Sequence, residues 1–132
     1  RVTVRRETTP IQKCAWAFAL LFLGVYLLDY VPGIMDQNGL MFGLFHMTRI
    51  VDIGHLVAGG LGVLGALLSA KMSRLYFYLL GVWYSIDVLT DFFSHLHARS
   101  LGVNIAVNLP HILILTAAFL IARHVSVQTP KS

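Results

Sequence analysis

The chain has 132 residues, of which 57% are hydrophobic and 12% are charged, with a mean hydropathy of +0.73. About a quarter of the residues of a soluble domain are charged, so this composition argues against a water-soluble protein and indicates an integral membrane protein. The net charge of +4 comes from basic residues at the ends of apolar segments, which argues against nucleic-acid binding.

Four apolar segments are each long enough to cross the hydrocarbon core of a membrane, which needs about 20 helical residues. Backbone groups in lipid must find hydrogen-bond partners within their own segment, and no alternating β-barrel pattern is present, so each segment is predicted to be a helix. The expected fold is all-α: a single-domain, polytopic bundle of four transmembrane helices. The predicted spans are Gln12–Val31, Ile50–Ala70, Leu75–His95 and Val103–Ala122.

The connectors between these spans differ in length and polarity. The first, Pro32–Thr48, begins with a Pro-Gly turn and becomes apolar again at Leu40–Phe45, which is too short to span a membrane. We expect this stretch to lie in the membrane interface or to dip into the mouth of the bundle. Lys71–Arg74 is predicted to be a tight basic turn, and His97–Gly102 a short loop.

The distribution of Lys and Arg predicts the orientation of the bundle, because cytoplasmic segments carry the excess of these residues. Two basic residues, Arg49 and Arg99, fall on one side, and eight fall on the side of the termini. Both termini are therefore predicted to be cytoplasmic, as in a bacterial inner-membrane protein. The first residue is Arg1 and not methionine, which leaves open whether residues precede it. The eight residues are Arg1, Arg5, Arg6, Lys13, Lys71, Arg74, Arg123 and Lys131.

Polar side chains within the predicted spans are concentrated at one level, near the outer face. On insertion scales an ionisable group at the membrane centre costs about 2.5–3.5 kcal/mol, so each such group is a candidate functional residue. The residues follow helical intervals, so each set lies on one face of its helix, and we expect the sets to converge in a polar funnel. They are Asp52 and His55 on the second span, Asp87, Asp91 and His95 on the third, and Asn104, Asn108 and His111 on the fourth, with Asp29 ending the first.

The favoured interpretation of this cluster is a bound divalent transition metal, zinc, copper, iron or manganese, because mixed imidazole and carboxylate ligation suits these ions. Two carboxylates one turn apart repel each other in lipid unless a proton or a cation lies between them. Arg49 or Arg99 is placed to reach Asp52 or His95, whereas Asp87 is too deep for either. The predicted ligands are His55, Asp91, His95 and His111, with Asp52, Asp87, Asn108 and Asp29 as further ligands or as groups that orient them.

Two alternatives to a bound transition metal remain open. Protonated carboxylates hydrogen-bonded to the histidines would form a structural network or a proton relay. Alternatively, His55 and His111 would ligate a b-type haem between the second and fourth spans, although haem faces need apolar walls and three aspartates lie nearby.

Several short motifs also carry a resemblance. They are Val31-Pro32-Gly33, Leu44-Phe45-His46, Asp52-Ile53-Gly54-His55-Leu56, Gly59–Gly65 and Asn108-Leu109-Pro110-His111. Together they resemble a family of small bacterial four-span membrane proteins of uncharacterised function, in which the second and fourth spans each carry a histidine preceded by a polar residue. The stripe from Asp87 to His95 is not part of that resemblance. Asp91-x-x-x-His95 is similar to the copper-site helix of the membrane methane and ammonia monooxygenases, although the spacing to His111 differs.

The sequence thus predicts a small inner-membrane protein with an outward-facing site for a divalent metal. The sequence shows no recognisable pairing of a catalytic nucleophile with a general base, so enzymatic activity is left open. The rival prediction is an accessory subunit of a larger membrane complex, or a homo-oligomer, in which the Asp/His cluster is a satisfied polar core.

Overall fold

The computed structural model describes residues 8–28, 30–34, 37, 40–41, 45–46 and 49–127. Its four helices are α1 (Pro10–Leu28), α2 (Arg49–Leu68), α3 (Ala70–Ser94) and α4 (Leu101–His124). Two very short strands, β1 (Leu40–Met41) and β2 (Phe45–His46), pair antiparallel between α1 and α2. The predicted all-α class is confirmed, and the four helices fall on the four predicted segments.

The connection between α2 and α3 is shorter than predicted. The predicted basic turn at Lys71–Arg74 is wrong, because these residues form the first turn of α3. The chain reverses at Ser69, whose hydroxyl accepts a hydrogen bond from the amide of Met72 at 3.1 Å and caps the helix. Of the apolar stretch Leu40–Phe45, residues 42–44 lie outside the described residues, so its predicted position at the interface stays a prediction.

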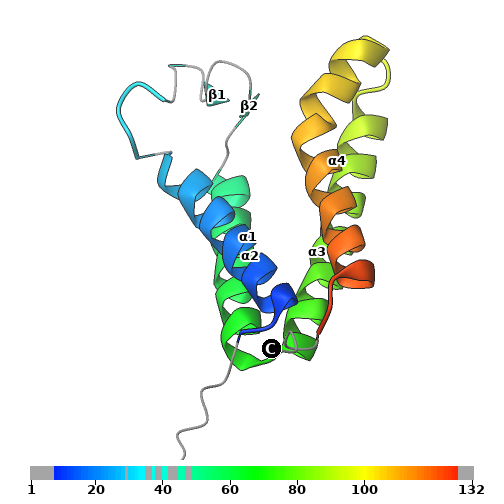
Figure 1. Ribbon diagram of the computed structural model, residues 1–132. Helices are drawn as coiled ribbons and strands as arrows, with labels where there is room; N and C mark the ends of the chain where they lie inside the picture. The colour runs from blue at the N-terminus through cyan, green and yellow to red at the C-terminus, as the bar shows by residue number, and fades with distance from the viewer. Residues whose placement is uncertain are drawn as a thin grey trace, which may run out of the picture.

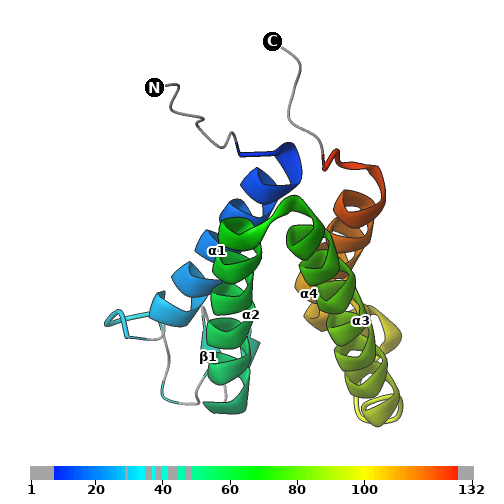
Figure 2. The same cartoon turned by 90° about the horizontal axis from the view of Figure 1, so that it is seen from below.

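The helices form two hairpins that together make a V. α1 packs along α2, and α3 packs along α4, as Figure 1 shows. The hairpins meet where α2 turns into α3 and diverge toward the other end of the molecule (Figures 1 and 2). We call these the closed end and the open end. At the closed end the amide of Ile11 donates to the carbonyl of Ser126 at 3.3 Å, so the start of α1 and the end of α4 lie side by side.

Small residues set the close approach of the helices within each hairpin. A Cβ added to Gly59 of α2 would lie 2.6 Å from the Cγ atom of Leu23 on α1, and one added to Gly81 of α3 would lie 2.7 Å from the ring of Phe119 on α4. Alanines and aromatic rings fill the rest of the interior. The buried core is Ile11, Ala15, Phe22, Ala66, Tyr76, Phe77, Leu80, Tyr84, Ala118 and Ala122.

Three of the described helices have the length and surface of membrane spans. α1, Val51–Leu68 of α2, and α4 are each long and apolar enough to cross a membrane. Many of their large apolar side chains are exposed on the surface, among them Leu20, Leu67 and Leu113. A surface of this kind needs lipid as its solvent, so the chain is a helical membrane protein.

Candidate functional site

The open end of the second hairpin contains a polar network built around Asp91 of α3. The guanidinium of Arg99, from the loop between α3 and α4, donates to Asp91 Oδ2 at 2.9 Å, and Asn108 Nδ2 of α4 donates to the same oxygen at 2.9 Å. His95 Nδ1 lies 3.4 Å from the other carboxylate oxygen. The carboxylate of Asp91 therefore has a cation and hydrogen-bond donors around it without any bound ion.

Two buried asparagines extend this network along α4. Asn104 Nδ2 donates to the carbonyl of Phe92 on α3 at 2.9 Å, and Asn108 Nδ2 also donates to the carbonyl of Asn104 at 2.9 Å. Both amides are almost fully buried. Because buried amides stabilise a fold only when their hydrogen bonds are made, this network joins α3 to α4. The sequence placed Arg99 near Asp52 or His95, and its pairing with Asp91 was missed.

A second polar pair lies deeper in the same hairpin. Nδ1 of His111 on α4 lies 2.8 Å from Asp87 Oδ2 on α3. An ionised carboxylate can only accept, so Nδ1 donates and the lone pair of Nε2 is left for another partner. The side chains of Asp87 and His111 are 49% and 32% exposed, so this pair is open to the space around α3 and α4.

His55 lies on the opposite hairpin, on α2. It is 8% exposed, and its ring stacks on Phe22 of α1 with a centroid separation of 6.1 Å. Among the described residues its Nδ1 has no hydrogen-bond partner, and neither has Oδ1 of Asp52, one turn away. Unsatisfied buried polar atoms of this kind call for a partner that the described residues do not supply.

A row of aromatic rings connects the two histidines. Phe22 stacks on Tyr84 of α3 with centroids 5.8 Å apart, and Tyr84 meets the ring of His111 edge-on at 4.9 Å. The row therefore runs from His55 through Phe22 and Tyr84 to His111, across all four helices. A haem between the two imidazoles would have to displace Phe22 and Tyr84, which are both buried.

The predicted ligands thus fall into two groups. Asp91, His95 and Asn108 belong to the network around Arg99, whereas the second group is associated with the two ends of the aromatic row. Within the described part of the chain, no three His, Cys, Asp or Glu side chains are close enough together to hold one metal ion. Asp29 lies outside the described residues. The residues of the second group are Asp52 and His55, one turn apart on α2, and the hydrogen-bonded pair Asp87 and His111.

Comparison with known protein families, with curated proteins and with solved structures finds no significant match to this chain. The motif resemblances to a four-span family and to the monooxygenase copper-site helix therefore stay predictions. A helical bundle alone does not define a function, so the functional argument rests on the side chains described above.

Proposed function

We propose that this chain is a four-span protein of the bacterial inner membrane that binds a divalent transition-metal ion in the outer half of its bundle. α3 has 25 residues, and at about 1.5 Å per residue it is long enough to cross a core of about 30 Å. Its packing along α4 supports a fourth span. The two ends of the described chain lie together at the closed end, and the excess of basic residues on that side supports a cytoplasmic location for both termini.

The hydrogen bond between His111 and Asp87 is the observation that carries the metal proposal. Histidines that ligate metals nearly always donate their other ring N–H to a carboxylate or carbonyl, which fixes the tautomer and the orientation of the ring. In this arrangement Nε2 of His111 is the ligand atom and Asp87 is the group that orients it.

His55 and Asp52 supply the other donors in this proposal. Each has a buried atom without a hydrogen-bond partner among the described residues, and both lie on the hairpin that faces His111 across the V. One ion receives donors from both hairpins when their diverging ends approach each other. Zinc, copper, iron and manganese all accept mixed imidazole and carboxylate ligands. Asp91 and His95 are left out of this ligand set, because Arg99 already balances the charge of Asp91.

Metal analysis of the detergent-purified protein tests this proposal. The wild type, reloaded with each candidate metal and desalted, is expected to retain about one ion per chain. His111→Ala and His55→Ala should lose it, and Asp87→Asn should weaken the affinity by about 10-fold to 100-fold, as is usual for a residue that orients a ligand.

Two matched histidine substitutions serve as controls. His124→Ala lies at the closed end and His95→Ala in the Arg99 network, so both variants should keep the metal. Loss of the metal in His95→Ala as well as in His55→Ala would favour the ligand set predicted from the sequence. A wild type that retains no ion after reloading would refute metal binding, and a Soret band in the same sample would favour haem.

The alternative of an accessory subunit of a larger membrane complex is supported by the Asp91 network, which is a satisfied polar core. In that case the exposed apolar face of α3, which includes Trp83 and Phe93, would pack against a partner. A protein that is stable only in a larger assembly and retains no metal would support this alternative.

A further inference from the structure

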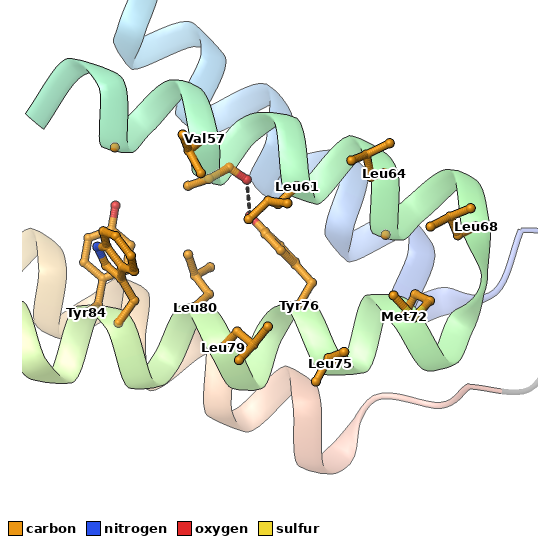
Figure 3. Close-up of a pocket in the computed structure, with 14 residues that line it drawn as sticks. Val57, Leu61, Leu64, Leu68, Met72, Leu75, Tyr76, Leu79, Leu80 and Tyr84 are labelled. Atoms are coloured by element: carbon orange, nitrogen blue, oxygen red, sulfur yellow. Dashed lines mark hydrogen bonds between the residues drawn. The ribbon is translucent and has the colours of Figure 1, made fainter. Parts of the chain in front are cut away.

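An apolar groove lies between α2 and α3, and no histidine among the described residues lines it. Its cavity has a volume of about 230 Å³, and its lining is almost entirely apolar. Figure 3 shows the side chains that border it from the two helices. They are Leu61, Leu64 and Leu68 on α2 and Met72, Leu75 and Leu79 on α3.

Tyr76 prevents the groove from closing. Its ring crosses from α3 to α2, and its hydroxyl donates to the carbonyl of Ala58 at 2.9 Å (Figure 3). Gly62 allows α2 to approach the ring of Tyr76, since a Cβ added to this glycine would lie 3.0 Å from the Tyr76 hydroxyl. Tyr76 thereby bridges the two helices, and the groove lies beside its ring.

The groove opens onto the lipid-facing surface at the depth of the hydrocarbon core. Leu64 and Leu79 on its two rims are 53% and 58% exposed, and within the described part of the chain no helix covers them. The lining runs from Gly54 to Leu68 along α2, which is roughly 21 Å of helix at about 1.5 Å per residue. One leaflet contributes about 15 Å of hydrocarbon, half of a core of about 30 Å, so a single acyl chain fits along this length.

The basic residues near the closed end of the groove indicate which class of lipid the groove would bind. Lys71 precedes Leu75 and Leu79 at intervals of four residues, so it lies on the same ridge of α3 as these two lining residues. Lys13 and Arg123 also lie at this end of the bundle, whereas the described carboxylates, Asp52, Asp87 and Asp91, all lie in the other half. The positive end of the α3 dipole points the same way.

We propose that this groove is a binding site for one acyl chain of an anionic phospholipid, whose phosphate pairs with Lys71 at the closed end. The acyl chain lies against Leu75 and Leu79, and dispersion contacts with the groove replace contacts with bulk lipid. A basic residue close to a membrane surface contributes about 1 kcal/mol of attraction to anionic lipid, which corresponds to about a fivefold preference over a zwitterionic lipid.

Quenching of tryptophan fluorescence by lipids with brominated acyl chains tests the site. Trp16 and Trp83 are replaced by Phe, and a single reporter is introduced by Leu79→Trp in the groove. The matched control is Leu113→Trp on α4. Leu79 lies nine residues from the start of α3 and Leu113 eleven residues from the end of α4, and the two are similarly exposed, at 58% and 61%.

The two reporters are compared in vesicles of phosphatidylcholine that contain a small fraction of brominated phosphatidylglycerol or of brominated phosphatidylcholine. At Leu79→Trp the phosphatidylglycerol should quench about fivefold more effectively per molecule, and Lys71→Gln should remove this preference. At Leu113→Trp the two lipids should quench equally. Equal quenching at both positions, or a preference that survives Lys71→Gln, would overturn the proposal.

Native mass spectrometry of the protein without reporter substitutions gives a second readout. The wild type should carry one phosphatidylglycerol molecule that persists at collision energies where phosphatidylcholine is lost. The Lys71→Gln variant should lose the two lipids at the same collision energy. Equal loss of the two lipids from the wild type would overturn the proposal. Neither readout depends on metal binding, so the lipid site and the metal site stand or fall separately.

Discussion

At the level of single residues, the chemistry of the open end depends on which partner each ionisable group finds. Asp91 and Asp87 are one turn apart on α3, yet one pairs with an arginine and the other with a histidine. Arg99 neutralises Asp91 permanently, because a guanidinium does not lose its proton in proteins. Because Nδ1 of His111 bonds to Asp87, its Nε2 is the ring nitrogen that can bind an ion, which is why Asp87 and not Asp91 belongs to the proposed metal site.

The pairing of Arg99 with Asp91 predicts a measurable coupling. Arg99→Ala leaves a partly buried carboxylate without its cation and should lower the free energy of unfolding by about 1–3 kcal/mol. Adding Asp91→Asn should recover part of that loss, since the uncompensated charge is then gone. Thermal and denaturant unfolding of the two single variants and the double variant in detergent measures the coupling. Additive losses would show that the two side chains do not interact.

At the level of elements, glycines decide how closely the helices of each hairpin approach. Gly59 and Gly60 are adjacent on α2 and differ in surroundings. A Cβ on Gly59 would lie 2.6 Å from the side chain and 3.3 Å from the backbone nitrogen of Leu23, whereas nothing lies within 4 Å of a Cβ on Gly60. The contact between α1 and α2 therefore depends on the first of these glycines only.

This difference predicts opposite effects of the same substitution at neighbouring positions. Gly59→Ala should lower the free energy of unfolding by about 1–3 kcal/mol, because α1 and α2 must move apart to admit the methyl group. Gly60→Ala should leave it unchanged or raise it by up to about 1 kcal/mol, because alanine is the better helix former. Unfolding in detergent compares the two variants. An equal loss in both would mean that helix contact is not the cause.

At the level of the whole molecule, the V shape separates two regions with different roles. At the closed end, the tight reversal at Ser69 and the hydrogen bond from Ile11 to Ser126 hold the two hairpins together. At the open end the hairpins diverge, and the proposed metal ligands come from both of them, Asp52 and His55 from α2 and His111 from α4. Binding of an ion is therefore expected to draw the hairpins together at that end.

The orientation of the molecule in the membrane predicts a labelling pattern. Ala98 lies between α3 and α4 and Lys71 at the start of α3, so these two positions flank the proposed span of α3. In a Cys14→Ala background, Ala98→Cys should react with an impermeant maleimide added to spheroplasts, and Lys71→Cys should react only after permeabilisation. Labelling of both positions from the same side would mean that α3 does not cross the membrane.

The sequence alone determined the four helices and their approximate limits, because the thickness of the membrane fixes how long an apolar helix must be. Helical periodicity also determined that the polar residues lie in stripes on their helices. The sequence could not determine that Asp91 pairs with Arg99 or that His55 stacks on Phe22. Nor could it determine that the chain reverses at Ser69, between α2 and α3. Those outcomes depend on how each helix is rotated about its axis and how closely it meets its neighbours. Only the packing of the four helices sets both, through contacts such as Gly59 with Leu23 and Gly81 with Phe119.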